Sequence, residues 1–211
     1  MTAATPDLIV VSTSGADSAL DNLDTLSQIA PTPAIDYSDK SWEELTTLPA
    51  TAVGKEDRAE EQLGEFDARI EEAAAAIAPA IAADPTVNIL TYNTPQESKI
   101  FTAESAQGHL ATRLGFTLAT VPAEVADPGS ASGRSDIISA AVENLPLALT
   151  GGTTFIINAQ QDDADRLLAD PTLATVPSVQ ADAVYPLGHD SFRLDYFSAN
   201  NVVDRIVAAL G

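Results

Sequence analysis

The chain has 211 residues, of which 31 are acidic and 10 basic, and its formal net charge is −21. Such a charge repels phosphate backbones, which argues against nucleic acid as a partner. Cysteine is absent, which excludes disulfides and thiolate sites, and two histidines leave little room for a histidine-based metal centre. Most metal and redox enzymes are therefore disfavoured.

The first 55 residues open with a β-α-β pattern. The apolar run from Asp7 to Ser12 predicts a parallel strand that is buried on both faces, a helix follows to about Ile29, and Ala34 to Tyr37 predicts a second strand. A strand so buried and so close to the first residue implies neighbours that this sequence does not supply. We therefore expect residues 1–55 to be the remnant of an α/β lobe that lacks its N-terminal part.

Residues 56–83 contain the strongest helical pattern. Between Glu56 and about Ala78 apolar residues recur every three or four positions, and charged residues fill the other face. Pro79 should kink or end this helix. At about 1.5 Å per residue the helix is about 35 Å long, and it would either pack against one sheet or form a spine between two lobes.

From residue 84 to residue 211 strands and helices alternate again. Strands are predicted at Val87–Tyr92, Thr153–Asn158 and Ala183–Leu187, a short extended segment at Phe116–Ala119, and helices at about Glu104–Leu114, Asp162–Leu168 and Ser198–Leu210. A Gly/Ser loop from Asp127 to Gly133 precedes a stretch that is predicted to be helical up to about Leu149. The alternation predicts an α/β fold whose second lobe is a mostly parallel, doubly wound sheet.

Local motifs for catalysis are weak. The segment Gly129–Ser135 is the one candidate phosphate loop, but it lacks the Lys-Ser/Thr ending, and Ala131 rules out a Gly-x-Ser-x-Gly elbow. His109 lies in a predicted helix without a second ligand at helical spacing. Sites built from distant residues leave no local motif, so these observations only lower the expectation of an enzyme.

Five segments resemble the iron-siderophore substrate-binding proteins, which are periplasmic binding proteins with two Rossmann-like lobes joined by one long helix. The segments are Pro6–Val11, Leu26–Thr32, Gly54–Glu60, Ser139–Pro146 and Phe192–Ala199. They span nearly the whole chain in the family's order, so the series is more specific than any one motif. The resemblance implies a first-lobe remnant at 1–55, an inter-lobe spine helix at 56–83 and a second lobe at 84–211.

The resemblance also implies a function. Such a protein is no enzyme and holds no cofactor; it captures a ferric siderophore and delivers it to the permease subunits of an ABC importer. It works outside the cytoplasm at the cell envelope, as a lipoprotein in its full-length form, although no signal peptide is visible in this sequence. The alternatives are a binder of haem or cobalamin on the same fold, or a chelatase-like or nitrogenase-like component that would need metal ligands.

The resemblance places second-lobe ligand contacts at Arg193 and Tyr196. A guanidinium suits the oxygen-rich, often anionic surface of a ferric chelate, and tyrosine adds a ring and a hydroxyl. The alternative is that Arg193 pairs with Asp195 or another surface acid. Tyr92 at the end of a predicted strand and His189 in a loop after another are further candidates, because ligand sites form at such ends.

Two more residues complete the predicted site. Arg134 is a ligand candidate in the Gly/Ser loop region. Glu143 resembles the second-lobe glutamate that docks onto permease arginines in this family, and the alternative is an ordinary exposed glutamate at a helix start. Unpaired strand edges in an incomplete lobe could also drive self-association between copies.

Overall fold

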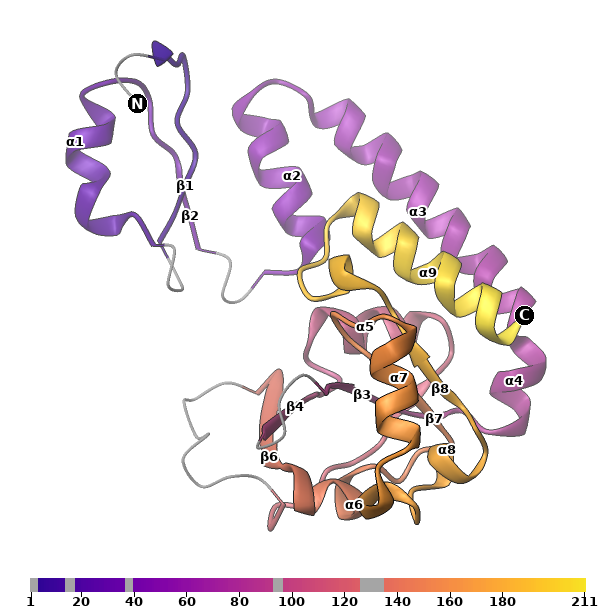
Figure 1. Cartoon of the computed structure of the whole chain (residues 1–211). Coiled ribbons are helices and arrows are strands. Elements are labelled where there is room, and N and C mark those ends of the chain that lie inside the picture. The colour runs from indigo at the N-terminus through magenta and orange to yellow at the C-terminus, as the bar shows by residue number, and fades with distance from the viewer. Residues whose placement is uncertain (1–3, 14–17, 37–39, 93–96, 126–134) are drawn as a thin grey trace. The chain divides into compact units, whose positions relative to one another are not determined.

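The computed structural model describes residues 4–13, 18–36, 40–92, 97–125 and 135–211 (Figure 1). The protein is a mixed α/β structure that forms two compact units, Met1–Gly64 and Glu65–Gly211. Within the described ranges, no helix is long and apolar enough to cross a membrane.

The first unit contains the predicted β-α-β pattern. Strand β1 (Val11–Ser12) pairs in parallel with β2 (Ala34–Ile35), and η2 (Leu20–Asn22) and α1 (Leu23–Ser27) connect them. The prediction that the first strand is buried on both faces was wrong. Ile9 and Val11 are buried in a cluster with residues of α1, whereas Val10 is 49% exposed, because side chains alternate along a strand and α1 covers one side.

Two helices follow. Helix α2 (Trp42–Ala52), which was not predicted, begins with a capping box in which Ser41 Oγ accepts from the Glu44 amide at 3.2 Å and Glu44 Oε2 accepts from the Ser41 amide at 2.8 Å. Helix α3 (Glu56–Ala76) contains the boundary between the two units.

The periodicity predicted for α3 is present, since Phe66, Ile70, Ala73 and Ile77 are buried. The helix breaks at Ile77, and α4 (Ala78–Ala83) continues with Pro79 in its first turn. The predicted segment 56–83 is therefore two helices, and its role as a spine between lobes stays a prediction.

The second unit is built on a sheet of strand order β6-β4-β3-β7-β8, with β5 paired to β3. Strand β3 pairs in parallel with β5 and β7, β7 pairs in parallel with β8, and β4 is antiparallel to both β3 and β6. Strands β3 and β6 therefore run in the same direction, and among the strands described in this sheet β4 alone runs the opposite way. The strands are β3 (Thr86–Thr91), β4 (Glu97–Phe101), β5 (Thr117–Leu118), β6 (Ile137–Ala141), β7 (Thr153–Ile156) and β8 (Val184–Pro186).

Two predictions for this sheet need correction. Strand β4 was missed, and the stretch before Leu149 that was predicted to be helical begins with strand β6. Only η4 (Val142–Asn144) and α6 (Leu145–Ala148) in that stretch are helical. The register Lys99↔Ser139 pairs β6 with β4, and such tertiary pairing overrides the weak helical preference of an alanine-containing segment.

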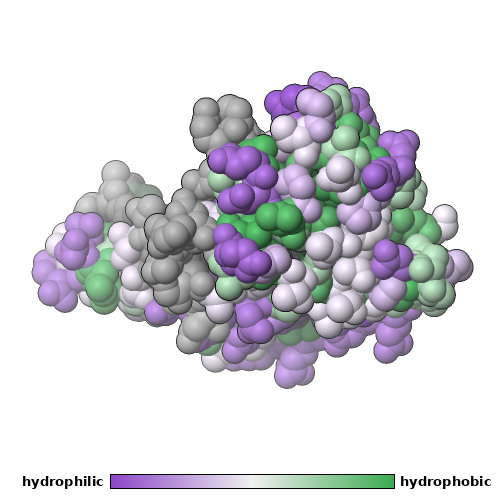
Figure 2. Space-filling model, turned by 90° about the horizontal axis from the view of Figure 1, so that it is seen from below, coloured by the Kyte–Doolittle hydropathy of each residue, from purple (hydrophilic) through white to green (hydrophobic). Residues whose placement is uncertain are grey.

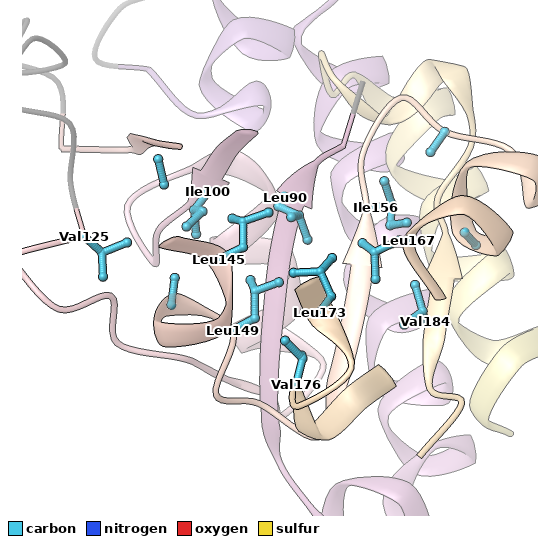
Figure 3. Packing of buried hydrophobic residues seen from close by; sticks show 14 residues of the cluster. Leu90, Ile100, Val125, Leu145, Leu149, Ile156, Leu167, Leu173, Val176 and Val184 are labelled. Atoms are coloured by element: carbon cyan, nitrogen blue, oxygen red, sulfur yellow. The ribbon is translucent and has the colours of Figure 1, made fainter. Parts of the chain in front are cut away.

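Helices cover both faces of the sheet. One face is covered by α6, α7 (Gln161–Leu168) and α8 (Pro177–Gln180). On this face, leucines and valines of the helices and the segments next to them pack against Leu90, Ile100 and Ile156 of the strands in a buried core cluster (Figure 3). The helices on the other side include α9 (Tyr196–Leu210), which lies beside the second-unit part of α3 in Figure 1. An ion pair between Arg69 and Asp204 at 2.5 Å joins these two helices. The remaining helices are α5 (Ala106–Arg113), η5 (Pro171–Leu173) and η6 (His189–Ser191).

A buried amide ties β3 to the turn before β7. Asn88 is 2% exposed, and its Nδ2 lies 3.1 Å from the Gly151 carbonyl and 2.9 Å from Thr154 Oγ1. Its Oδ1 accepts from the Gly151 amide at 3.0 Å. The side chain is thus satisfied on both ends, as a buried polar group must be.

Candidate functional site

The topology brings several predicted residues to one edge of the sheet. Because β3, β6, β7 and β8 share a direction, their carboxyl ends lie at the same edge, which is where ligand sites of open α/β sheets form. Tyr92 follows β3, Glu143 follows β6 and His189 follows β8. Asn158 follows β7 at the same edge.

The loop from residue 188 to residue 195, here called the β8–α9 loop, carries two of the predicted ligand contacts, His189 and Arg193. Its backbone is hydrogen-bonded to the segment after β7, since the Gly188 amide donates to the Ala159 carbonyl at 3.0 Å. Ser191 is fully buried; its Oγ donates to the Gly188 carbonyl at 2.7 Å and accepts from the Asn158 amide at 2.9 Å.

A second support for the β8–α9 loop comes from α5. Gln107 is buried, and its Nε2 donates to the carbonyls of Ser191 at 2.9 Å and Phe192 at 2.8 Å. The Phe192 ring meets the Phe101 ring edge-on, with centroids 6.0 Å apart. The loop is therefore held by fixed groups on two sides.

His189 is exposed, and its Nδ1 lies 3.2 Å from Asn158 Oδ1. Asn158 has a φ of 54°, a left-handed conformation that asparagine tolerates better than most residues. The sequence pattern predicted Asn158 only as the end of a strand. An asparagine directly after an apolar strand was the signal that could have identified it.

Arg193 and Tyr196 lie within four residues of each other, at the end of the loop and the start of α9. Arg193 is exposed, and its carbonyl accepts from Ser198 Oγ at 3.2 Å. The Asp195 carboxylate, the predicted alternative partner of Arg193, accepts from the Ser198 amide at 2.8 Å and caps α9. The Tyr196 hydroxyl donates to the Glu65 carboxylate of α3 at 2.9 Å.

Tyr92 lies at the carboxyl end of β3, but its hydroxyl donates to the Asp170 carboxylate at 2.5 Å, and the ring packs against the core cluster. Burial and this hydrogen bond raise the pKa of Tyr92 to about 12. The hydrogen bonds from Tyr92 and Thr172 hold the pKa of Asp170 below its usual value. The hydroxyl of Tyr92 is thus bound to an internal partner.

Glu143 is exposed in η4, and Leu147 in α6 is 61% exposed. Figure 2 shows the face below α6, where a hydrophobic area is bordered by hydrophilic residues. Arg134 lies outside the described residues.

In the first unit, β2 and α2 line a pocket of about 310 Å³. Its walls are mainly apolar, with Ile35 and Leu48 among them, and Asp36 and Lys40 are its charged residues. None of the predicted ligand contacts lines this pocket.

Among the described residues, no group of three or more His, Cys, Asp or Glu side chains is placed so that it could hold a metal ion. His109 is exposed in α5. The chelatase-like or nitrogenase-like alternative needs metal ligands, and the described part of the chain contains no cluster that joins His109 or His189 to two or more carboxylates.

The carboxyl edge of a mostly parallel α/β sheet is the usual place of a ligand site, and here it carries exposed polar and charged side chains. The sequence pattern of a periplasmic binding protein family matches residues 1–190, and the chain belongs to this family. The resemblance inferred from the sequence motifs is confirmed.

Individual proteins that are similar to this chain support the same family assignment. Over 203 residues, or 96% of the chain, the sequence is 43% identical to the ferric enterobactin-binding periplasmic protein FepB of Escherichia coli O6:H1. The crystal structure of holo-ViuP aligns with the whole of this chain, and the alignment covers 69% of the ViuP chain, with a TM-score of 0.83 and 31% identity. The Fe³⁺-Desferal-bound siderophore-binding protein FhuD of Vibrio cholerae matches 99% of the chain and 76% of its own length, with a TM-score of 0.77 and 22% identity, which supports the fold alone.

The chain spans 63% of the length of FepB. The predicted α/β fold is confirmed by the described structure and by these neighbours.

Proposed function

We propose that this chain belongs to the substrate-binding component of an ABC importer, which captures a ferric siderophore outside the cytoplasm and delivers it to a membrane permease. The observation that carries the proposal is the 43% identity, over 96% of the chain, to a protein named for binding ferric enterobactin. The role is non-catalytic, and the iron arrives as part of the ligand rather than as a cofactor.

The β8–α9 loop supports this proposal. A ferric tricatecholate carries several negative charges on oxygen, and exposed arginine and histidine side chains suit such a surface. In a chain whose net charge is −21, Arg193 supplies an exposed guanidinium and His189 an exposed imidazole, both able to donate hydrogen bonds to ligand oxygens.

We propose Arg193 and His189 as the main contacts of this loop, with Tyr196, Tyr92 and Arg134 as further contacts. Two of these contacts are constrained, because the Tyr196 and Tyr92 hydroxyls already donate to carboxylates. They would contact the ligand through their rings, or their hydroxyls would change partners on binding.

The domain organisation belongs to the same proposal. Residues 1–55 would form part of the first lobe, residues 56–83 the spine between lobes, and residues 84–211 the second lobe. We also propose that the full-length protein is a lipoprotein of the cell envelope, and that copies of this chain can associate through open strand edges in residues 1–55, which analytical ultracentrifugation would test.

The test is binding of a defined panel: ferric enterobactin, ferrichrome, ferric desferrioxamine, haem and cobalamin. We expect ferric enterobactin to raise the melting temperature, because a ligand at about 100 times its Kd stabilises the folded state by about 2.7 kcal/mol. Isothermal titration calorimetry then gives the Kd, and iron-free enterobactin is the control. A full-length protein whose melting temperature responds to no member of the panel refutes the proposal.

Permease docking is tested separately, through Glu143. In reconstituted transport with the cognate permease, we expect Glu143→Ala to reduce uptake and leave the Kd for ferric siderophore unchanged. Glu124→Ala, which changes another exposed glutamate of the second unit, is the matched control. Equal uptake by the two variants would exclude docking through Glu143.

A further inference from the structure

The side chain of Arg205 reaches from α9 to the β8–α9 loop. Its Nη1 donates to the Leu187 carbonyl at 2.6 Å, at the end of β8, and to Asp190 Oδ1 at 2.6 Å inside the loop. One helical turn earlier, Asn201 Nδ2 donates to Asp190 Oδ2 at 2.8 Å. Both oxygens of the Asp190 carboxylate are therefore bound by residues of α9.

Gly188 provides the space for this contact. Its φ is +85°, which side chains with a Cβ rarely adopt, and a Cβ at this position would lie 2.4 Å from both Cζ and Nη1 of Arg205. The guanidinium thus lies directly against the backbone at the first residue of the loop. A larger residue at 188 would displace the guanidinium.

The charge on Asp190 fits this arrangement. Partial burial works against its ionisation, but the hydrogen bonds from Arg205 and Asn201 outweigh burial and keep the pKa of Asp190 below its usual value. At neutral pH the carboxylate is therefore charged, and its hydrogen bond to Arg205 is charge-assisted.

We infer that Arg205 is a positioning residue, which together with Asp190 and Asn201 fixes the β8–α9 loop in the conformation that presents His189 and Arg193 to the ligand. The inference rests on the proposed function. A loop that is already ordered does not lose that conformational freedom on binding, so the affinity rises without any contact between Arg205 and the ligand.

A plain surface ion pair is the competing explanation, and such pairs contribute little. Arg205 differs because it also binds a backbone carbonyl and abuts Gly188, so it restrains the path of the chain. The same helix supplies a matched control: Asp204 pairs with Arg69 at 2.5 Å, and Arg69 belongs to α3 rather than to the loop.

The experiment compares Arg205→Met, Arg205→Lys, Gly188→Ala and Arg69→Met in the full chain. Hydrogen–deuterium exchange of the loop amides measures its order, calorimetry with ferric enterobactin measures the Kd, and melting temperature measures global stability. We expect Arg205→Met and Gly188→Ala to speed loop exchange and to weaken binding, each at least tenfold.

Arg205→Lys should recover part of both losses, because an ammonium can still donate to Asp190. Arg69→Met should change neither loop exchange nor Kd. A similar fall in melting temperature for Arg205→Met and Arg69→Met would separate the loss of affinity from a loss of stability.

Unchanged loop exchange in Arg205→Met overturns the inference. Faster exchange with an unchanged Kd overturns it as well, because the loop's order would then not matter for binding. A wild-type chain that binds no ferric chelate overturns the proposed function and the binding role of Arg205 together, whereas the exchange data still decide whether Arg205 orders the loop.

Discussion

The hydroxyl of Tyr92 donates a hydrogen bond of 2.5 Å to the carboxylate of Asp170, a residue 78 positions further along the chain. The bond joins the end of β3 to the segment after α7, beside the buried core cluster against which Tyr92 packs. Asp170 also caps η5 by accepting from the Thr172 amide at 2.8 Å. One carboxylate therefore fixes both a strand end and a helix start.

Tyr92→Phe should lower the free energy of unfolding at pH 7 by about 1.5–3 kcal/mol, the usual range for a hydrogen bond to a charged group. The pKa of Asp170 is lowered in the folded state, so its contribution is complete above its ordinary value of 3.8 and is lost as the pH falls through the lower folded value. Urea unfolding between pH 2 and 7 measures this. A difference between variant and wild type that is independent of pH would contradict the assignment.

At alkaline pH the Tyr92–Asp170 hydrogen bond predicts that stability falls as the pH rises. The pKa of Tyr92 is raised from 10.0 to about 12, so its contribution is complete below about pH 10 and is lost as the pH rises towards 12. In the wild type, absorbance at the tyrosinate band should include the late titration of Tyr92, and Tyr92→Phe should lack that contribution. If the late step persists in the variant, it belongs to another tyrosine.

Asn88→Ala should cost about 1–3 kcal/mol of unfolding free energy, because the Gly151 amide would stay buried without its acceptor. Ser98→Ala is the matched comparison. Ser98 Oγ is buried, no described residue hydrogen-bonds to it, and its removal should be neutral or stabilising by up to about 1 kcal/mol. Denaturant melts of both variants test this, and equal losses would refute the contrast.

Arg193→Ala should weaken binding of ferric enterobactin by about 1–3 kcal/mol, or about five- to 150-fold in Kd, because it removes a charge-assisted contact. Arg166→Ala, which removes an exposed arginine that pairs with Asp163 on α7, is the control and should bind as the wild type does. Calorimetry at two salt concentrations measures both. The same Kd for the two variants would remove Arg193 from the site.

The sequence was sufficient for elements that have a strong pattern. The strands around Val87, Thr153 and Val184 are rich in apolar and β-branched residues, and α9 repeats its apolar residues at helical spacing, so their types were predicted correctly. Strand β4 was missed because its buried Ser98 and exposed Lys99 give it no apolar run. The pairing of β4 with β6 makes that segment a strand, and pairing between strands depends on the tertiary structure and not on the local sequence.

The site could be predicted in part for a similar reason. Its position at the carboxyl ends of strands follows from a parallel topology, and this brought Tyr92 and His189 into consideration. The contacts of Gln107 and Arg205 with the loop could not be found, since these two residues come from separate helices. Only the folded chain places them next to the loop.

The antiparallel direction of β4 also has a consequence for the order of folding. Leu90 pairs with Ile100, ten residues away, whereas it pairs with Ile156 at a separation of 66 residues. Closing the longer loop costs about 1.7 kcal/mol more in chain entropy on a logarithmic dependence on length. Local pairing is therefore favoured early, and we expect the β3–β4 hairpin to nucleate the sheet before β7 docks against its other side.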